Sequence, residues 1–488
     1  MNQPEATLDP RRWLALAVIL SATLLGVLDF LIVNIAVPSI RADLHATDAE
    51  IQLTIAGYGL AYAVCLVTGG RLGDIYGRKK MFLWGMGGFT LASALCGLAQ
   101  TPMQLVAFRI IQGLLASLMS PQVLAIIQVT FAGRERDTAT GAMGAVVGVG
   151  SFIGNVFGGW LVGANIFNLG WRPIFFVNVP IGIIAMVCAW FWVRESKAEK
   201  AQKLDIPGAL LCGVALFCLI FPLAEGRERG WPAWAFVMMV ASTLLAWVFV
   251  RYERGVAARD GSPLIDMNLF QEKPFARGLC GVFLLFSGMG SFALTLTIFL
   301  QDGLGQTPQR TGLIFAPLAV AFLLASLSAV KLTQRMGTKV LALGLSVALV
   351  GQFWMLGLLL AFHGSLNPLW LMPPMFVYGI GQGLTVPRLI RSTMNTIEGH
   401  HAGAAAGVLS TVQQIAFAVG VSIVGSIFFS LLGSSGHASR DVYTRAWAVA
   451  LGCNILSFGL TRIIVMRLLP ATHPDKDVLP EAVCVETA

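Results

Sequence analysis

The stretch Gly70-Arg71-Leu72-Gly73-Asp74-Ile75-Tyr76-Gly77-Arg78-Lys79-Lys80 is a short charged segment between two apolar runs, 51–70 and 81–100. Each run has about the 20 residues that an α-helix needs to cross a bilayer core. The glycines permit tight backbone approach, and Asp74 can pair with Arg78 or cap a neighbouring helix N-terminus. The pattern predicts two membrane-spanning helices joined by a tight loop, whose basic residues also favour one side of the membrane.

The rest of the 488-residue chain continues this pattern. It is 56% hydrophobic and 12% charged, with a mean hydropathy of +0.76, whereas soluble domains are about 25% charged. The first run is too long for a cleavable signal peptide. We therefore predict an all-α polytopic membrane protein with 14 transmembrane helices, at 13–37, 51–70, 81–100, 103–127, 139–164, 173–193, 206–224, 232–250, 276–300, 309–330, 338–361, 367–389, 402–431 and 444–468.

The basic residues predict the orientation. The chain carries a formal net charge of +8. With the N-terminus placed inside, 25 of the 33 Lys and Arg residues fall in inner segments and seven in outer ones, and Arg109 lies within a span. Basic residues accumulate on the cytoplasmic side of membrane proteins. We therefore expect both termini to be cytoplasmic, and we read the basic charge as an orientation signal rather than as a nucleic-acid-binding surface.

An internal repeat predicts two halves. Leu72, Gly77 and Lys79 recur as Leu332, Gly337 and Lys339, and Gln112-Gly113-Leu114 recurs as Gln382-Gly383-Leu384. We expect six-helix halves at 1–200 and 256–470, two inserted helices at 201–255, and a cytoplasmic tail at 471–488. Duplicated halves around a midplane site are typical of secondary transporters.

Several motifs in order resemble the major facilitator superfamily, and within it the fourteen-span drug:proton antiporters. The loop 70–80 is similar to the superfamily signature G-x-L-x-D-x-x-G-R-K, with Ile75 where a basic residue is usual. Leu28 to Pro38 resembles the first-span signature, Arg109-Ile110-Ile111-Gln112-Gly113 the fourth-span signature, and Trp171 to Pro180 the entry to span six. The antiporter motif of span five is matched by Gly150, Gly154, Gly158 and Gly159, with Asn155 where proline is usual.

The resemblance implies a major-facilitator-type fold and multidrug efflux from the cytoplasmic (inner) membrane, with antibiotic resistance as a consequence. It implies export of hydrophobic or amphiphilic molecules by a monomer that uses the proton motive force and no other cofactor. It also implies that Gly70, Gly73, Asp74, Gly77, Arg78 and Lys79 form a loop that controls the conformational balance.

Asp29 and Arg109 are the candidate proton-coupling residues. By the run boundaries, Asp29 is the one acid well inside a span and Arg109 the one deeply embedded cation. Inserting either charge costs at least about 2.5–3.5 kcal/mol, so such residues point to function. Both lie roughly 9–13 Å from the outer end at the helical rise. We expect the two to meet and to exchange a proton against a substrate; a purely structural ion pair is the alternative.

The remaining site candidates are weaker. Gln112 lies three residues after Arg109 on the same helix face, where it can bind substrate or orient the guanidinium. Asn34 is expected to bond a neighbouring helix or to reach the substrate cavity. The other candidates for the cavity are Tyr58, Tyr62, Tyr378 and Gln382. The four-residue glycine spacing in span five is explained by close helix packing, and a role in antiport follows only from the resemblance.

Other functions stay open on the sequence alone. One alternative is a dedicated exporter or importer of a single metabolite, an anion included, with Arg109 as its partner. A membrane enzyme is disfavoured because the spans hold no nucleophile–base set, and a passive channel because they hold no ring of charges. The eight cysteines form no C-x-x-C pair, the histidines have no metal-site spacing and no G-x-x-x-x-G-K-[ST] loop occurs, so we expect no metal, no disulfide framework and no ATP-driven pump. The expected partners are a small-molecule substrate and the lipid bilayer.

Overall fold

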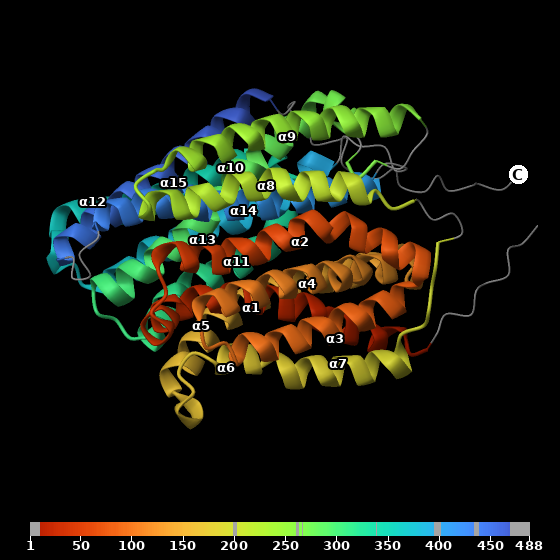
Figure 1. The fold of residues 1–488 in the computed structure, drawn as a ribbon, viewed down its shortest axis with the longest axis horizontal. Coiled ribbons are helices and arrows are strands. Elements are labelled where there is room, and N and C mark those ends of the chain that lie inside the picture. The colour runs from red at the N-terminus through yellow and green to blue at the C-terminus, as the bar shows by residue number, and fades with distance from the viewer. Residues whose placement is uncertain are drawn as a thin grey trace, which may run out of the picture.

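The computed structural model describes residues 10–198, 203–259, 263–265, 267–337, 339–394, 402–433 and 439–468. Within these ranges the chain is all-helical, and the long helices run roughly along one common direction (Figure 1). The predicted tail at 471–488 lies outside the described residues.

Every apolar run that the sequence predicts is occupied by a helix, with α6 and α7 sharing the sixth run. The α-helices are α1 Arg12–Leu44, α2 Asp48–Tyr76, α3 Arg78–Gly97, α4 Pro102–Thr130, α5 Gly133–Ala164, α6 Pro173–Phe176, α7 Asn178–Trp192, α8 Ile206–Glu228, α9 Ala233–Ala258, α10 Lys273–Ile298, α11 Pro308–Met336, α12 Lys339–Phe362, α13 Met372–Met394, α14 Ala402–Leu432 and α15 Arg440–Leu468. Short helical turns are η1 Ile166–Asn168, η2 Met267–Gln271, η3 Phe299–Gly303 (a π-helical turn), η4 His363–Ser365 and η5 Pro368–Leu371.

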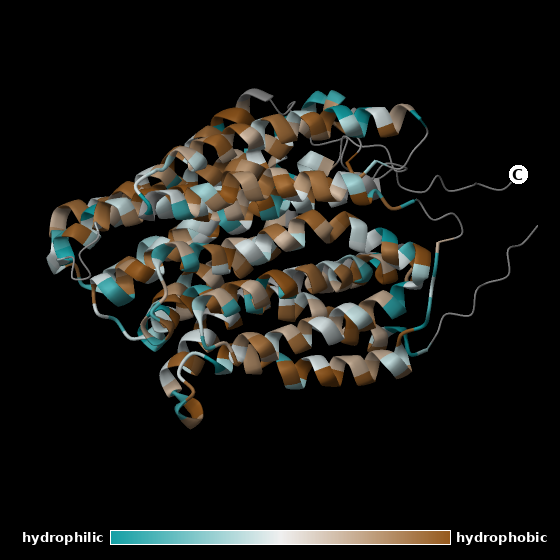
Figure 2. Cartoon of the chain, in the orientation of Figure 1, coloured by the Kyte–Doolittle hydropathy of each residue, from teal (hydrophilic) through white to brown (hydrophobic). Residues whose placement is uncertain are grey.

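The length and apolar character of these helices fit a membrane. Among the described residues, 11 helical segments are long and apolar enough to cross a bilayer. Hydrophobic residues predominate along the long helices (Figure 2), and large apolar side chains such as Trp84, Trp190 and Phe236 are exposed. The remaining three long helices, α3, α5 and α13, pack among the spans. The fold is therefore that of an all-α polytopic membrane protein.

Two equivalent glycine contacts reflect the internal repeat. A Cβ on Gly113 of α4 would stand 2.3 Å from the carbonyl oxygen of Tyr58 in α2. A Cβ on Gly383 of α13 would stand 2.4 Å from the carbonyl oxygen of Phe322 in α11. Helix backbones approach this closely only where a glycine faces the neighbour. The repeated Gln-Gly-Leu segments therefore make the same kind of helix contact in two different helix pairs.

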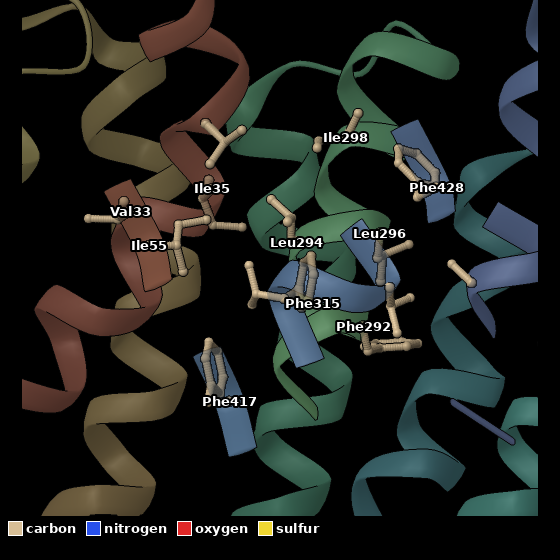
Figure 3. Close-up of a cluster of buried hydrophobic side chains, with 14 of the residues drawn as sticks. Val33, Ile35, Ile55, Phe292, Leu294, Leu296, Ile298, Phe315, Phe417 and Phe428 are labelled. Atoms are coloured by element: carbon tan, nitrogen blue, oxygen red, sulfur yellow. The ribbon is translucent and has the colours of Figure 1, made fainter. Parts of the chain in front are cut away.

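The first six helical segments meet the last six in an apolar cluster. Figure 3 shows Val33 and Ile35 of α1 and Ile55 of α2 in the same cluster as Leu294 of α10 and Phe417 of α14. Burial of such side chains contributes about 25 cal/mol per Å² of apolar surface. The cluster therefore holds α1 and α2 against the helices of the C-terminal part.

Polar contacts close one end of the bundle, which we call the Arg41 end. Arg41 forms ion pairs with Asp48 and with Asp302, at 2.9 and 3.3 Å. The Gln301 side chain donates a hydrogen bond to the Ile35 carbonyl oxygen at 2.8 Å. The opposite end, the Arg71 end, carries the loop between α2 and α3 and the connections around α8 and α9 (right in Figure 1).

Charged residues near helix ends depart from the sequence expectation. The count of basic residues places Arg388 at an inner segment, and the run 232–250 leaves Glu253 in a connection. The structure places Arg388 in α13 and Glu253 in α9, and both side chains are buried. Arg109 is therefore not the one embedded cation. A buried charge is tolerated at a helix end where a neighbouring element supplies a hydrogen bond, as the Ile265 N–H does for Glu253.

Candidate functional site

The centre of the site is an ion pair between α1 and α4. Arg109 Nη1 donates to Asp29 Oδ2 at 2.5 Å, and the two side chains are 1% and 0% exposed. Such a pair is stable inside a protein only when further hydrogen bonds satisfy its remaining atoms. The structure thus brings together the two residues that the sequence singled out.

Two amide side chains complete the shell around the carboxylate. Gln112 Nε2 and Asn178 Nδ2 donate to Asp29 Oδ1 at 2.9 and 3.0 Å. Gln112 Oε1 accepts from Arg109 Nη1 at 2.6 Å, so this residue bridges both charges. Asp29 therefore accepts three donors, from α4 and α7, and its ionised form is fully satisfied.

Ser93 of α3 provides a second acceptor for the same amides. Its hydroxyl oxygen accepts from Gln112 Nε2 at 2.7 Å and from Asn178 Nδ2 at 3.3 Å. The sequence reasoning missed Ser93 and Asn178. Asn178 carried a signal, because it is a polar residue inside the apolar run 173–193 and within the motif at the entry to span six. Ser93 carried none, because a serine within an apolar helix usually bonds its own backbone.

Aromatic rings cover the ion pair. The Arg109 guanidinium lies over the Tyr58 ring at 4.2 Å from the ring centroid, and a cation–π contact of this kind is worth up to about 2 kcal/mol when desolvated. Tyr62 stacks on Tyr58, and Phe30 joins Tyr58 to Phe417 of α14. Tyr58 and Tyr62 therefore lie between the ion pair and the C-terminal helices.

Three other cavity candidates do not join the cluster. Asn34 donates to the Phe30 carbonyl oxygen at 3.0 Å, so it bonds its own helix and not a neighbouring one. Tyr378 packs between Phe292 and Phe458, far along the chain in the C-terminal core. Gln382 is one turn further along α13 and is buried as well.

The loop between α2 and α3 is organised around one glycine and two acids. Gly77 has φ +115°, a region that favours glycine, and Asp74 Oδ1 accepts from Arg78 Nη2 at 2.8 Å. Glu195, which follows α7, accepts from the backbone N–H groups of Lys79 and Lys80. The N-terminus of α3 is therefore capped by Glu195 and not by Asp74, a role that sequence spacing could not reveal across 116 residues.

The glycines of the loop and of α5 are sites of close helix contact. A Cβ on Gly73 would overlap Gln122 of α4, and one on Gly70 would touch Pro121. Along α5, Gly150, Gly154 and Gly158 face α1, whereas Gly159 faces the Pro308 carbonyl oxygen of α11. The α5 glycines thus join α1 to α11. The side chain of Asn155 lies outside the described residues.

The fold and the site together define a class. A buried, fully hydrogen-bonded ion pair deep among apolar membrane-spanning helices, in a bundle with repeated helix contacts, is typical of a secondary transporter. The family comparison agrees, because the model of the Major Facilitator Superfamily matches residues 19–421 and 278–482. The chain belongs to the major facilitator superfamily.

Relatives in the family are named for antibiotic export or resistance. The chain is 42% identical over 432 residues to a probable actinorhodin transporter of Streptomyces coelicolor, covering 88% of this chain and 75% of that protein. It is 33% identical over 472 residues to a puromycin resistance protein of Streptomyces alboniger, covering 94% and 92%. It is 31% identical over 451 residues to the multidrug resistance protein Stp of Mycobacterium tuberculosis, covering 91% and 82%.

Solved structures show the same fold at low identity. A bacterial homologue of the human lysosomal transporter Spinster, in an inward-facing conformation, matches with a TM-score of 0.67 at 15% identity, covering 94% of this chain and 97% of that one. A D-xylose–proton symporter matches with a TM-score of 0.65 at 14% identity, covering 95% and 99%.

Proposed function

We propose that the protein exports hydrophobic or amphiphilic small molecules, antibiotics among them, in exchange for protons. The observation that carries the proposal is the Asp29–Arg109 pair, buried and joined to helices α1, α4 and α7 through Gln112 and Asn178. The names of the relatives support outward transport and small molecules as the substrates.

The hydrogen-bond shell suggests how a proton would be coupled to movement. Ionised Asp29 accepts from three donors, and protonation would place an O–H on one of its oxygens and weaken the hydrogen bonds that this oxygen accepts. Gln112 and Asn178 already contact the Ser93 hydroxyl, which can accept them when Asp29 binds a proton. Protonation would therefore loosen the contacts between α1, α4 and α7, and movement of these helices would in turn admit the proton.

The energy source and the arrangement in the membrane belong to the same proposal. The proton motive force would drive export with no other cofactor, and the Arg71 end would face the cytoplasm with both termini. The segments 1–200 and 256–470 would act as the two moving halves of a monomer, with 201–255 inserted between them. Alternating access of duplicated halves around a midplane site is the general scheme for such transporters.

A second candidate function is export of one anionic metabolite. Arg109 favours it, because a guanidinium under an aromatic ring can bind a carboxylate or phosphate bidentately. In the described state, however, Arg109 is already occupied by Asp29 and Gln112. An anion would have to displace Asp29, so we rank this candidate second.

Transport into inverted membrane vesicles tests the proposal. An imposed pH gradient, acidic inside, should drive accumulation of cationic and neutral lipophilic compounds, and collapsing the gradient should stop it. Vesicles that contain Asp43→Asn serve as a matched control, because Asp43 lies on the same helix and pairs with Arg172 near the Arg41 end. Accumulation of anionic compounds alone would favour the second candidate, and accumulation that ignores the gradient would overturn proton coupling.

A further inference from the structure

A second pair of buried acids lies at the Arg71 end, apart from the Asp29 site. Asp205 directly precedes α8 and Glu253 lies near the end of α9; their side chains are 5% and 0% exposed. Asp205 Oδ2 and Glu253 Oε1 would each lie 2.4 Å from a Cβ built on Gly208. The two carboxyl groups therefore face each other across Gly208, at the base of the two inserted helices.

The hydrogen bonds fix where a proton must sit. Asp205 accepts from Gly208 N at 2.9 Å, from the Tyr252 hydroxyl at 3.0 Å and from Leu264 N at 3.1 Å. Glu253 accepts from Ile265 N at 3.0 Å through Oε2, whereas its buried Oε1 has no donor. Asp205 Oδ2 and Glu253 Oε1 lie beside the same point in a buried site. Two ionised carboxylates placed this close together repel each other, which favours one proton shared by the pair. Asp205 has three donors of its own and Glu253 Oε1 has none, so Glu253 Oε1 is the atom that a shared proton would occupy.

Asp205, Glu253 and Arg71 all form hydrogen bonds with residues 263–265. Leu264 and Ile265 belong to the connection from α9 to α10, and Pro263 of this connection accepts a hydrogen bond from Arg71 of α2. Arg71 also donates to the Lys203 carbonyl oxygen, before α8, at 3.0 Å. Figure 1 shows α8 next to α2. One segment of three residues thus joins the N-terminal helices, the inserted helices and the start of the C-terminal helices.

We propose that Asp205 and Glu253 form a proton-binding switch that fastens residues 263–265 to the inserted helices when one proton is shared and releases them when it is lost. Loss of the proton leaves two carboxylates in contact in a buried site, which like charges disfavour. Among the described residues, the charged and titratable groups that interact with the pair are Arg71 of α2, Tyr252 of α9 and Cys212 of α8. The one cation among them cannot balance two ionised carboxylates.

The pH at the Arg71 end would therefore control how firmly the connection to α10 is attached. In the singly protonated form, the connection to α10 is tied both to Arg71 and to the inserted helices. In the unprotonated form the carboxyl groups no longer hold the connection while the Arg71 contact to Pro263 remains, so the C-terminal helices gain freedom relative to α2. Helices α8 and α9 would then respond to pH through the Asp205–Glu253 pair. This regulation goes beyond the proposed export and uses none of the residues around Asp29.

Hydrogen exchange of the full-length protein tests the switch without any substrate. After correction for intrinsic exchange, the protection of the Leu264 and Ile265 amides in wild type should fall with rising pH. The fall should approach about tenfold per pH unit in the range where the closed pair holds the proton and the opened pair has lost it, and should level off above that range. Glu253→Gln should keep these amides protected at all pH values, because its Nε2 donates permanently to Asp205 in place of the acid proton. Glu225→Gln, a buried acid at the other end of α8, should behave as wild type.

A second variant keeps the test sharp. Tyr252→Phe removes one donor to ionised Asp205, so the pair should hold its proton more tightly and the loss of protection should move to higher pH. The proposal is overturned if protection in wild type does not change with pH, or if wild type and Glu253→Gln lose it in parallel. Because no transport is measured, these results stand whether or not Asp29 couples export to protons.

Discussion

At the scale of single residues, the proposed proton coupling depends on the hydrogen bonds of Arg109. Its Nη1 serves both Asp29 and Gln112, and its Nε donates to the Thr54 carbonyl oxygen at 3.4 Å. A planar fork can make these contacts together, whereas the lysine ammonium is a single point charge. Substitution by lysine, which keeps the charge, and by alanine, which removes it, should therefore separate the effect of the charge from that of the guanidinium shape.

We predict that Arg109→Ala abolishes transport and that Arg109→Lys retains part of it. Removing one partner of a buried pair costs about 3–5 kcal/mol because the other charge is left alone, so Arg109→Ala should also lower the unfolding temperature. Transport rates and thermal unfolding of the purified variants measure both effects. Arg172→Ala, which breaks a half-exposed pair with Asp43, should cost less than about 1 kcal/mol. Normal transport by both Arg109 variants would make the pair dispensable.

The sequence predicted part of this site. Asp29 and Arg109 stood out because ionisable residues are rare inside apolar runs, and Gln112 followed from helical spacing. Ser93 and Asn178 did not, because uncharged polar residues occur in most spans and only the packing of α3 and α7 against α1 shows which of them face the pair. Asn34 does not contact the pair: its Nδ2 donates to the Phe30 carbonyl oxygen of its own helix, and its buried Oδ1 has no partner.

At the scale of helices, the close contacts of α4 on α2 and of α13 on α11 depend on two glycines. We predict that Gly113→Ala and Gly383→Ala each destabilise the protein by about 1–3 kcal/mol, as overpacking does, because the new methyl group would meet a backbone carbonyl. Gly26→Ala in α1 is the matched control, since nothing lies within 4 Å of a Cβ there. Thermal unfolding in detergent measures the change; equal unfolding temperatures for the three variants would contradict the helix contacts.

Helix positions were predictable, and helix ends were not. The fourteen apolar runs predicted the helical segments because a run of about 20 apolar residues has the length of a membrane-spanning helix. The apolar runs end before the helices do, however: α9 continues to Ala258 and α13 to Met394. For that reason Glu253, which follows the run 232–250, is expected in a connection, and the Asp205–Glu253 pair could not be expected from the sequence.

At the scale of the whole molecule, the structure is closed at the Arg41 end by contacts of Arg41 with Asp302 and of Gln301 with Ile35. Each contact joins residues more than 260 positions apart. The sequence could not predict which state is closed, because both states use the same helices and differ only in such contacts between halves.

We predict that Asp302→Asn weakens this closure and raises the population that is open at the Arg41 end. Spin labels at Phe167 and Leu313, both exposed, would report it as a second, longer distance in a background without reactive thiols. Asp441→Asn is the control, because Asp441 contacts Gly364 within the C-terminal helices. A distance distribution unchanged from wild type would show that Arg41 and Asp302 do not hold the closed state.

Proteoliposomes that contain Asp29→Asn test most directly whether Asp29 couples proton movement to export. Asparagine keeps the size of the side chain and can still accept from Gln112 and Asn178, but it cannot exchange a proton. We predict that the variant loses uphill transport driven by a pH gradient and keeps substrate exchange at equal pH, whereas Asp43→Asn keeps both. Undiminished uphill transport by Asp29→Asn would contradict the account.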